Sequence, residues 1–159
     1  MATQTYIPLA THTLSSNTAV ITFSNLPSKY KDFIIFIDGD TTASCRPVMR
    51  FNNDNTTNRH RAVVFGTGNY SSTNQSAKID FIPGYAITGT FTMVVQVFDA
   101  NTTDKNTSLL YRVNQHDGNH THMGAGTYQT TTAISEFYFD VTANAYAAGT
   151  KFDLFGIEA

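Results

Sequence analysis

Apolar residues in this chain recur at every second position, and no window keeps a helical period over three turns. The clearest case is Glu136–Val141, where Phe and Val alternate with Glu, Tyr and Asp. Successive side chains of a strand point to opposite faces, so this period is that of a half-buried strand. After the small-residue turn Ala147-Ala148-Gly149, residues 151–154 repeat the alternation. We therefore expect an all-β chain whose last strand is part of the core.

Other stretches of the same kind are separated by turn-forming Gly, Asn, Asp and Pro residues. The predicted strands begin at Tyr6 and then span residues 19–23, 33–38, 48–51, 60–65, 78–82, 90–98, 109–114, 121–128, 136–141 and 150–157. Segments 52–58, 66–76 and 101–108, rich in Asn, Thr, Ser and Tyr, are predicted as exposed loops. Many short strands at this spacing are typical of a sandwich or barrel.

The end of the chain resembles that of small jelly-roll modules in the virions of tailed bacteriophages. In those modules a strand, a turn of the form Ala-Ala-Gly-Ser/Thr and an aromatic-rich strand ending in Gly-Ile close the fold, as in residues 136–157 here. Residues 25–32 (Asn-Leu-Pro-Ser-Lys-Tyr-Lys-Asp), which lead into an apolar strand, and residues 49–52, which precede a polar loop, also fit the family. The resemblance covers most of the chain. It implies a jelly-roll-like antiparallel β-sandwich that forms a single domain over residues 1–159.

The same resemblance implies a non-enzymatic structural protein of the virion, made in the host cytoplasm. A capsid decoration or cement protein that bridges neighbouring major capsid proteins is the favoured form, because no shaft or coiled-coil segment precedes the first strand at Tyr6. A homotrimer is expected from phage architecture. The alternative is a tail-fibre or tail-tip receptor-binding protein that recognises host-surface glycans through residues such as Tyr70, Tyr85 and Tyr128.

The charge balance excludes partners that bind mainly by electrostatics. Charged residues make up 14% of the chain and its net charge is −2, so we expect no nucleic-acid partner. The N-terminus lacks the pattern of a signal peptide, and no run of roughly 18 apolar residues occurs, so we expect no membrane insertion. Cys45 is the only cysteine, which rules out an intramolecular disulfide.

One predicted strand, Phe33-Ile34-Ile35-Phe36-Ile37, is apolar on both faces. The simpler explanation is a central strand that its own fold covers on both sides. The functional explanation is that one face packs on a neighbouring subunit, because a large exposed apolar patch would otherwise favour aggregation. Residues 33–37 are therefore candidates for a subunit interface.

Histidines supply the one pattern that suggests metal binding. His116, His120 and His122 fall within seven residues, and the last two would share a face of a strand. In a trimer, His120 and His122 of each copy could line the three-fold axis and complete a site together. Local hydrogen bonding by solvent-facing or interface histidines is the simpler explanation, and we expect no bound metal or other cofactor.

Enzyme chemistry has no supporting motif. The His-x-His pair resembles that of cupin metalloenzymes, but their motif requires a Gly six residues before the first His, where this chain has Asn114, and also a later Glu that is missing. Asp38-Gly39-Asp40 and residues 52–55 could offer oxygen ligands to calcium, although without the spacing of a loop site. No nucleophile motif occurs either. We therefore expect a protein that is not an enzyme.

Overall fold

The computed structural model describes residues 5–56, 59–66, 70–78, 86–116 and 121–158, with the backbone alone described in 59–66 and 70–78. Within these residues every regular element is a β-strand. The strands are β1 (Tyr6–Thr13), β2 (Ile21–Ser24), β3 (Asp32–Gly39), β4 (Pro47–Phe51), β5 (Arg59–Gly66), β6 (Tyr70–Lys78), β7 (Phe91–Phe98), β8 (Thr107–Gln115), β9 (Thr121–Tyr128), β10 (Glu136–Val141) and β11 (Lys151–Ile157).

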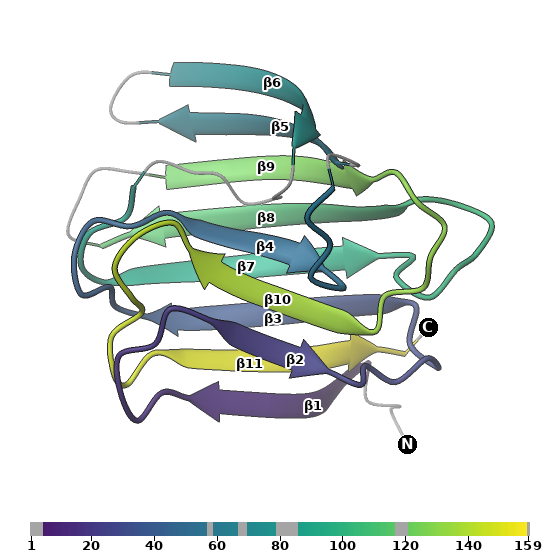
Figure 1. Cartoon of the computed structure of the whole chain (residues 1–159), viewed down its shortest axis with the longest axis horizontal. Helices are drawn as coiled ribbons and strands as arrows, with labels where there is room; N and C mark the ends of the chain where they lie inside the picture. Colours follow the sequence, from purple (N-terminus) through teal and green to yellow (C-terminus); the bar gives the residue numbers. More distant parts are fainter. Residues whose placement is uncertain (1–4, 57–58, 67–69, 79–85, 117–120, 159) are drawn as a thin grey trace.

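The strands form two antiparallel sheets. The larger sheet has eight strands in the order β1-β11-β3-β7-β8-β9-β5-β6, and the smaller has three in the order β2-β10-β4. The small sheet lies across one face of the large one (Figure 1). The prediction of an all-β, jelly-roll-like antiparallel sandwich is confirmed.

The hydrophobic core lies between the two sheets. Alternate residues of β7, which are Phe91, Met93, Val95 and Val97, are all at most 1% exposed. From the small sheet, Phe137 meets Phe33 of β3 edge to face, with ring centroids 5.2 Å apart. Burial of these alternate apolar side chains stabilises the packing of one sheet on the other. Aromatic pairs in edge-to-face geometry add to that stability.

Tyr146 fixes the connection between β10 and β11, which belong to different sheets. Its side chain is fully buried, its ring meets that of Phe152 edge to face at 5.2 Å, and its hydroxyl donates to the Asp140 carbonyl at 3.2 Å. Its backbone N–H and C=O both bond to Thr18 at 3.0 Å. A buried phenol with a partner for its hydroxyl is a stable arrangement, so this residue ties three parts of the chain together.

One loop predicted from the sequence is a strand in the structure. Residues 66–76 were expected to form a loop, but 70–78 form β6, the edge strand that pairs with β5. Its sequence, YSSTNQSAK, has no apolar alternation, which is the signal that the prediction used. Of the strand predicted at 78–82, residues 79–82 lie outside the described residues.

Candidate functional site

The face of the large sheet that points away from the small sheet is the candidate site, and we call it the outer face. Residues directly opposite in neighbouring strands share a face, so the strand register defines rows across it. Across β11, β3, β7, β8 and β9, one row is Asp153, Phe36, Val94, Arg112 and Met123. The next row is Phe155, Ile34, Gln96, Leu110 and Ala125. Most of these ten positions carry apolar side chains.

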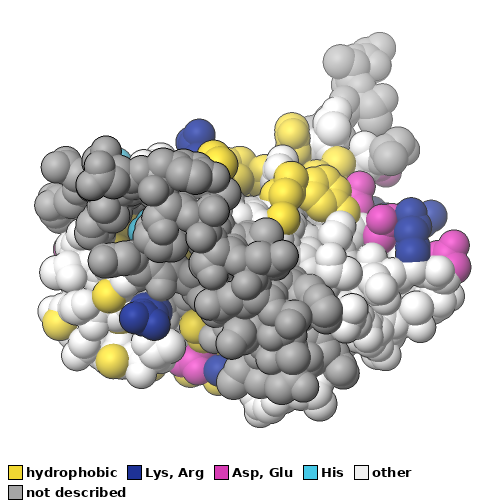
Figure 2. Space-filling view, turned by 90° about the horizontal axis from the view of Figure 1, so that it is seen from above, with side chains coloured by type: hydrophobic (Ala, Val, Ile, Leu, Met, Phe, Trp, Pro, Cys, Tyr) yellow, Lys and Arg dark blue, Asp and Glu magenta, His cyan; other side chains and the backbone are white. Residues whose placement is uncertain are grey.

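Three large apolar side chains of the outer face are exposed to solvent. Phe36 is 42% exposed, and Leu110 and Met123 are each 48% exposed. Hydrophobic side chains are seen grouped at the surface in Figure 2. Single exposed apolar residues are ordinary, whereas neighbouring ones on a single face mark an interaction site.

Phe36 and Phe155 form an aromatic pair on the β3–β11 half of the outer face. Their ring centroids lie 5.8 Å apart at 83°, an edge-to-face contact between diagonal neighbours of adjacent strands. Ile34, which lies opposite Phe155, is only 5% exposed. This half of the face is therefore already packed within the chain, and it presents the aromatic rings outward.

The β7–β9 half of the outer face holds an open hollow of about 540 Å³. Its lining includes Val94, Gln96, Leu110, Arg112, Met123 and Ala125. An apolar floor with one amide and one guanidinium suits a partner that brings an apolar group together with an acidic one.

Opposite charges flank the apolar centre of the first row. Arg112 is exposed on β8, and Asp153 is half-buried on β11. Burial raises the pKa of the Asp153 carboxyl, but hydrogen bonds from Lys151 and Thr11 outweigh burial and hold that pKa below its usual value. The Lys151 Nζ lies 2.7 Å from the carboxylate, and the Thr11 hydroxyl donates to it at 2.6 Å. Asp153 is therefore ionised at neutral pH.

The apolar run at 33–37 divides between the two faces of β3. Phe33, Ile35 and Ile37 are at most 1% exposed and belong to the core cluster. Ile34 and Phe36 point to the outer face, where only Phe36 is substantially exposed. Of the five candidates for a subunit interface, Phe36 is the one that the structure presents to solvent.

Of the two candidate metal ligands, the structure places only one. His120 lies outside the described residues, while His122 of β9 sits opposite Val113 and is 2% exposed. The backbone N–H of His116 donates to the Thr90 carbonyl at 2.9 Å. Across residues 5–56, 59–66, 70–78, 86–116 and 121–158, no group of three or more His, Cys, Asp or Glu is placed to hold a metal ion.

The two acidic and amide segments considered for calcium lie at opposite ends of the sandwich. Asp38-Gly39-Asp40 ends β3, whereas Asn52 follows β4 at the other end (Figure 1). An Asp40 carboxylate oxygen accepts from the Thr41 N–H at 2.7 Å. The Asn52 side-chain oxygen accepts the N–H of Ser135 at 2.8 Å. Both segments therefore stabilise turns and do not form one joint site.

Among the tyrosines expected to bind a glycan, the side chain of Tyr128 alone falls within the described residues. It is 4% exposed, and its hydroxyl donates to the Asp54 carboxylate at 2.6 Å. Its ring also meets Phe51 edge to face at 5.7 Å. Tyr128 thus packs in the core and offers no stacking face.

In the part of the chain that the structure describes, no helix has the length and apolar character needed to cross a membrane.

Sequence reasoning did not identify Leu110, Arg112 and Met123 as surface residues that act together. A usable signal was present for Leu110, because it stands at an outward position of β8 between the polar outward residues Ser108 and Arg112. An apolar residue out of phase with its strand is a sign of a second contact surface. Their alignment with Phe36, however, depends on the pairing of distant strands.

No family model matches the chain, and no curated protein sequence matches it. Among solved structures, it is similar to galectin LEC-6 from Caenorhabditis elegans, with 10% identity, a TM-score of 0.40 and coverage of 94% of this chain and 96% of that one. It is also similar to Xenopus laevis galectin-Ib, at 7% identity, a TM-score of 0.37 and coverage of 86% and 99%. A PL-14 alginate lyase from Aplysia kurodai has 12% identity, a TM-score of 0.33 and coverage of 84% and 72%. Likeness at this level says nothing about ligand or activity.

Proposed function

We propose that the chain is a non-enzymatic structural protein of a tailed-phage virion, and specifically a capsid decoration or cement protein that stabilises the shell by bridging major capsid proteins. The observation that carries the proposal is the outer face, where Phe36, Leu110 and Met123 stay 42–48% exposed on one rigid sheet. A flat apolar sheet surface works by packing on another protein. The resemblance of the end of the chain to virion modules supports a virion as the assembly in which this surface acts.

The physical task of such a protein is to add buried area across seams between capsid subunits. Stable protein–protein interfaces bury about 1,200–2,000 Å² in total. Neighbouring apolar residues at the centre of a face and polar residues around it match the usual anatomy of an interface. The outer face has this arrangement on its β11 side, where Lys151 and Asp153 border the apolar residues, while Arg112 stands between Val94 and Met123.

The copy number of the protein per purified virion tests this proposal. Quantitative mass spectrometry would compare its amount with that of the major capsid protein. We expect one copy per capsid subunit or a simple fraction of that ratio. A total of a few to a few tens of copies would contradict a decoration role and move the protein to the tail, and its absence from virions would overturn the proposal altogether. The homotrimer stays a prediction that the mass of the purified protein checks.

A further inference from the structure

We propose that the outer face binds another copy of this chain, with the aromatic pair Phe36–Phe155 of each copy on the hollow of its neighbour and Arg112 of each copy opposite Asp153 of its neighbour. The inference rests on the proposed function only in taking the outer face as a protein-binding surface. It names another copy of the chain as the partner that covers this face, so that a pair of copies, and not a single copy, bridges the capsid subunits.

The two halves of the outer face are complementary to each other. The β3–β11 half presents aromatic rings and the ionised Asp153, whereas the β7–β9 half presents an apolar hollow and the exposed Arg112. Each half therefore offers a shape that the other lacks, and Asp153, which also pairs with Lys151 of its own strand, brings a carboxylate to the exposed Arg112. A surface of this kind fits itself, because opposite potentials across an interface set its register and disfavour wrong partners.

The row spacing allows the match without any change in the strands. Asp153 and Arg112 stand three strands apart, or about 14 Å, since neighbouring strands lie roughly 4.8 Å apart. A two-fold axis that runs along the strands, midway between β3 and β7, places Asp153 over Arg112 of the neighbour. It also places Phe36 over the neighbouring Val94.

The second row meets in the same way. With the two sheets about 10 Å apart, as in ordinary face-to-face packing, Phe155 lies over Leu110 of the neighbour. Val94, Leu110 and Arg112 all line the hollow. The contact therefore places the aromatic pair and the Asp153 carboxylate of one copy at the hollow of the other.

The area of the outer face is adequate for a stable contact. Five strands of about eight residues cover on the order of 600 Å² of flat sheet, and one side of a standard interface buries about 800 Å² of accessible surface. Uneven side chains make the accessible area larger than the flat area. The face is thus of the size used by one partner of a dimer or a ring.

The contact closes about a two-fold axis, where each copy gives both halves of its outer face to a single neighbour.

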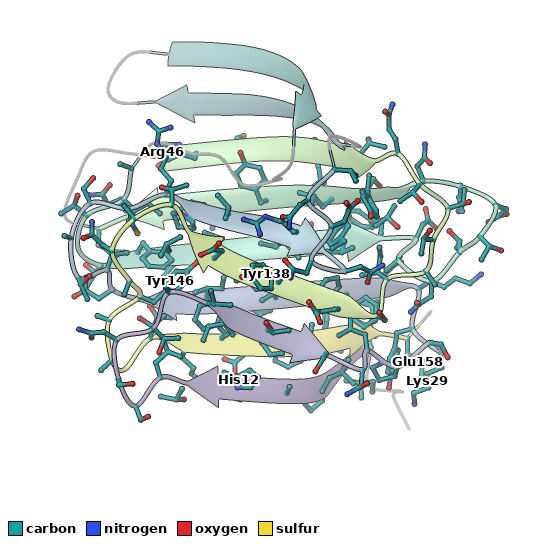
Figure 3. The ribbon with its side chains drawn as sticks, in the orientation of Figure 1. His12, Lys29, Arg46, Tyr138, Tyr146 and Glu158 are labelled. Atoms are coloured by element: carbon teal, nitrogen blue, oxygen red, sulfur yellow. The ribbon has the colours of Figure 1, made fainter. Side chains whose placement is uncertain are left out.

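Sedimentation equilibrium of the purified full chain at several concentrations tests the inference. We expect the wild type to associate with an even number of copies, as a two-fold contact requires, and Arg112→Glu to weaken the association at least tenfold. Leu110→Ser should weaken it as well, and because Leu110 is 48% exposed this change should leave the fold intact. Arg46→Glu is the matched control, an equal charge reversal at an exposed residue before β4 and outside the outer face (Figure 3).

A charge swap, Arg112→Asp combined with Asp153→Arg, should restore much of the association that Arg112→Glu removes. A wild type that is monomeric at every concentration, or variants of the outer face that associate as tightly as the wild type, would overturn the inference. A monomer that is nevertheless present in virions at one copy per capsid subunit would leave the proposed function standing, so the two failures are distinguishable.

Discussion

Gly156 of β11 packs directly against the ring of Tyr30, and a Cβ at position 156 would lie 2.6 Å from the Tyr30 Cγ. Both residues are buried, and Tyr30 also meets Phe33 edge to face with ring centroids 6.3 Å apart. The glycine in the Phe-Gly-Ile ending of the chain is therefore required by the close approach of an aromatic ring from the segment before β3.

Gly156→Ala should destabilise the protein by about 1–3 kcal/mol, because the added methyl must displace a packed ring. Urea unfolding followed by circular dichroism measures this free energy. In a Tyr30→Ser background the same substitution should cost clearly less, since the clashing ring is gone. Equal costs in the two backgrounds would show that the Tyr30 contact does not explain the glycine.

Asn52→Ala should cost about 1–2 kcal/mol of unfolding free energy. Its side-chain oxygen accepts the N–H groups of Ser135 and Glu136, and its amide donates to the Ala133 carbonyl at 3.0 Å. Asn53→Ala is the matched control, because Asn52 and Asn53 share a positive φ, 52° and 46°, while the exposed Asn53 side chain takes no part in these bonds. If the two variants lost equal stability, backbone conformation alone would account for the effect.

Cys45 should make the protein less stable at alkaline pH. Burial raises the pKa of its thiol from 9.0 to about 11, although a hydrogen bond with Thr41 partly opposes this. Between those values the thiol ionises in the unfolded chain but not in the folded one, so its contribution is complete below pH 9 and is lost as pH rises to 11. The loss is on the order of 2 kcal/mol.

The measurement is the unfolding free energy of the wild type and Cys45→Ala at pH values on either side of that window. Cys45→Ala should show a shallower decline with pH, whatever its cost at neutral pH. Parallel declines would mean that the burial of the thiol is not linked to folding.

Alternation predicted most of the sandwich because each inner strand carries its own signal. In β10, for example, Phe137 and Phe139 are both fully buried, as their spacing indicates. The polar edge strand β6 could not be found in this way, because its sequence has no apolar period. Apolar periodicity detects a strand that buries one face. It does not detect a strand that is recognisable only by its backbone hydrogen bonds.

The outer face could not be assembled from the sequence for a different reason. Asp153 and Arg112 fall in one row only because β11, β3, β7 and β8 pair in a fixed register. Register depends on contacts between residues far apart in the chain, and a slip by one residue would turn Phe36 inward. The sequence alone could identify the apolar run at 33–37, but not which of its residues face solvent.

The claim that this protein works through its outer face is tested most directly by its amount in virions that carry Leu110→Ser. Mass spectrometry would measure that amount relative to the major capsid protein, with Val20→Ser as control, because Val20 is 38% exposed in the segment before β2 and not on the large sheet. We expect Leu110→Ser to lower the incorporated protein at least tenfold and Val20→Ser to leave it unchanged. Wild-type amounts of the Leu110→Ser protein in the virion would contradict the account.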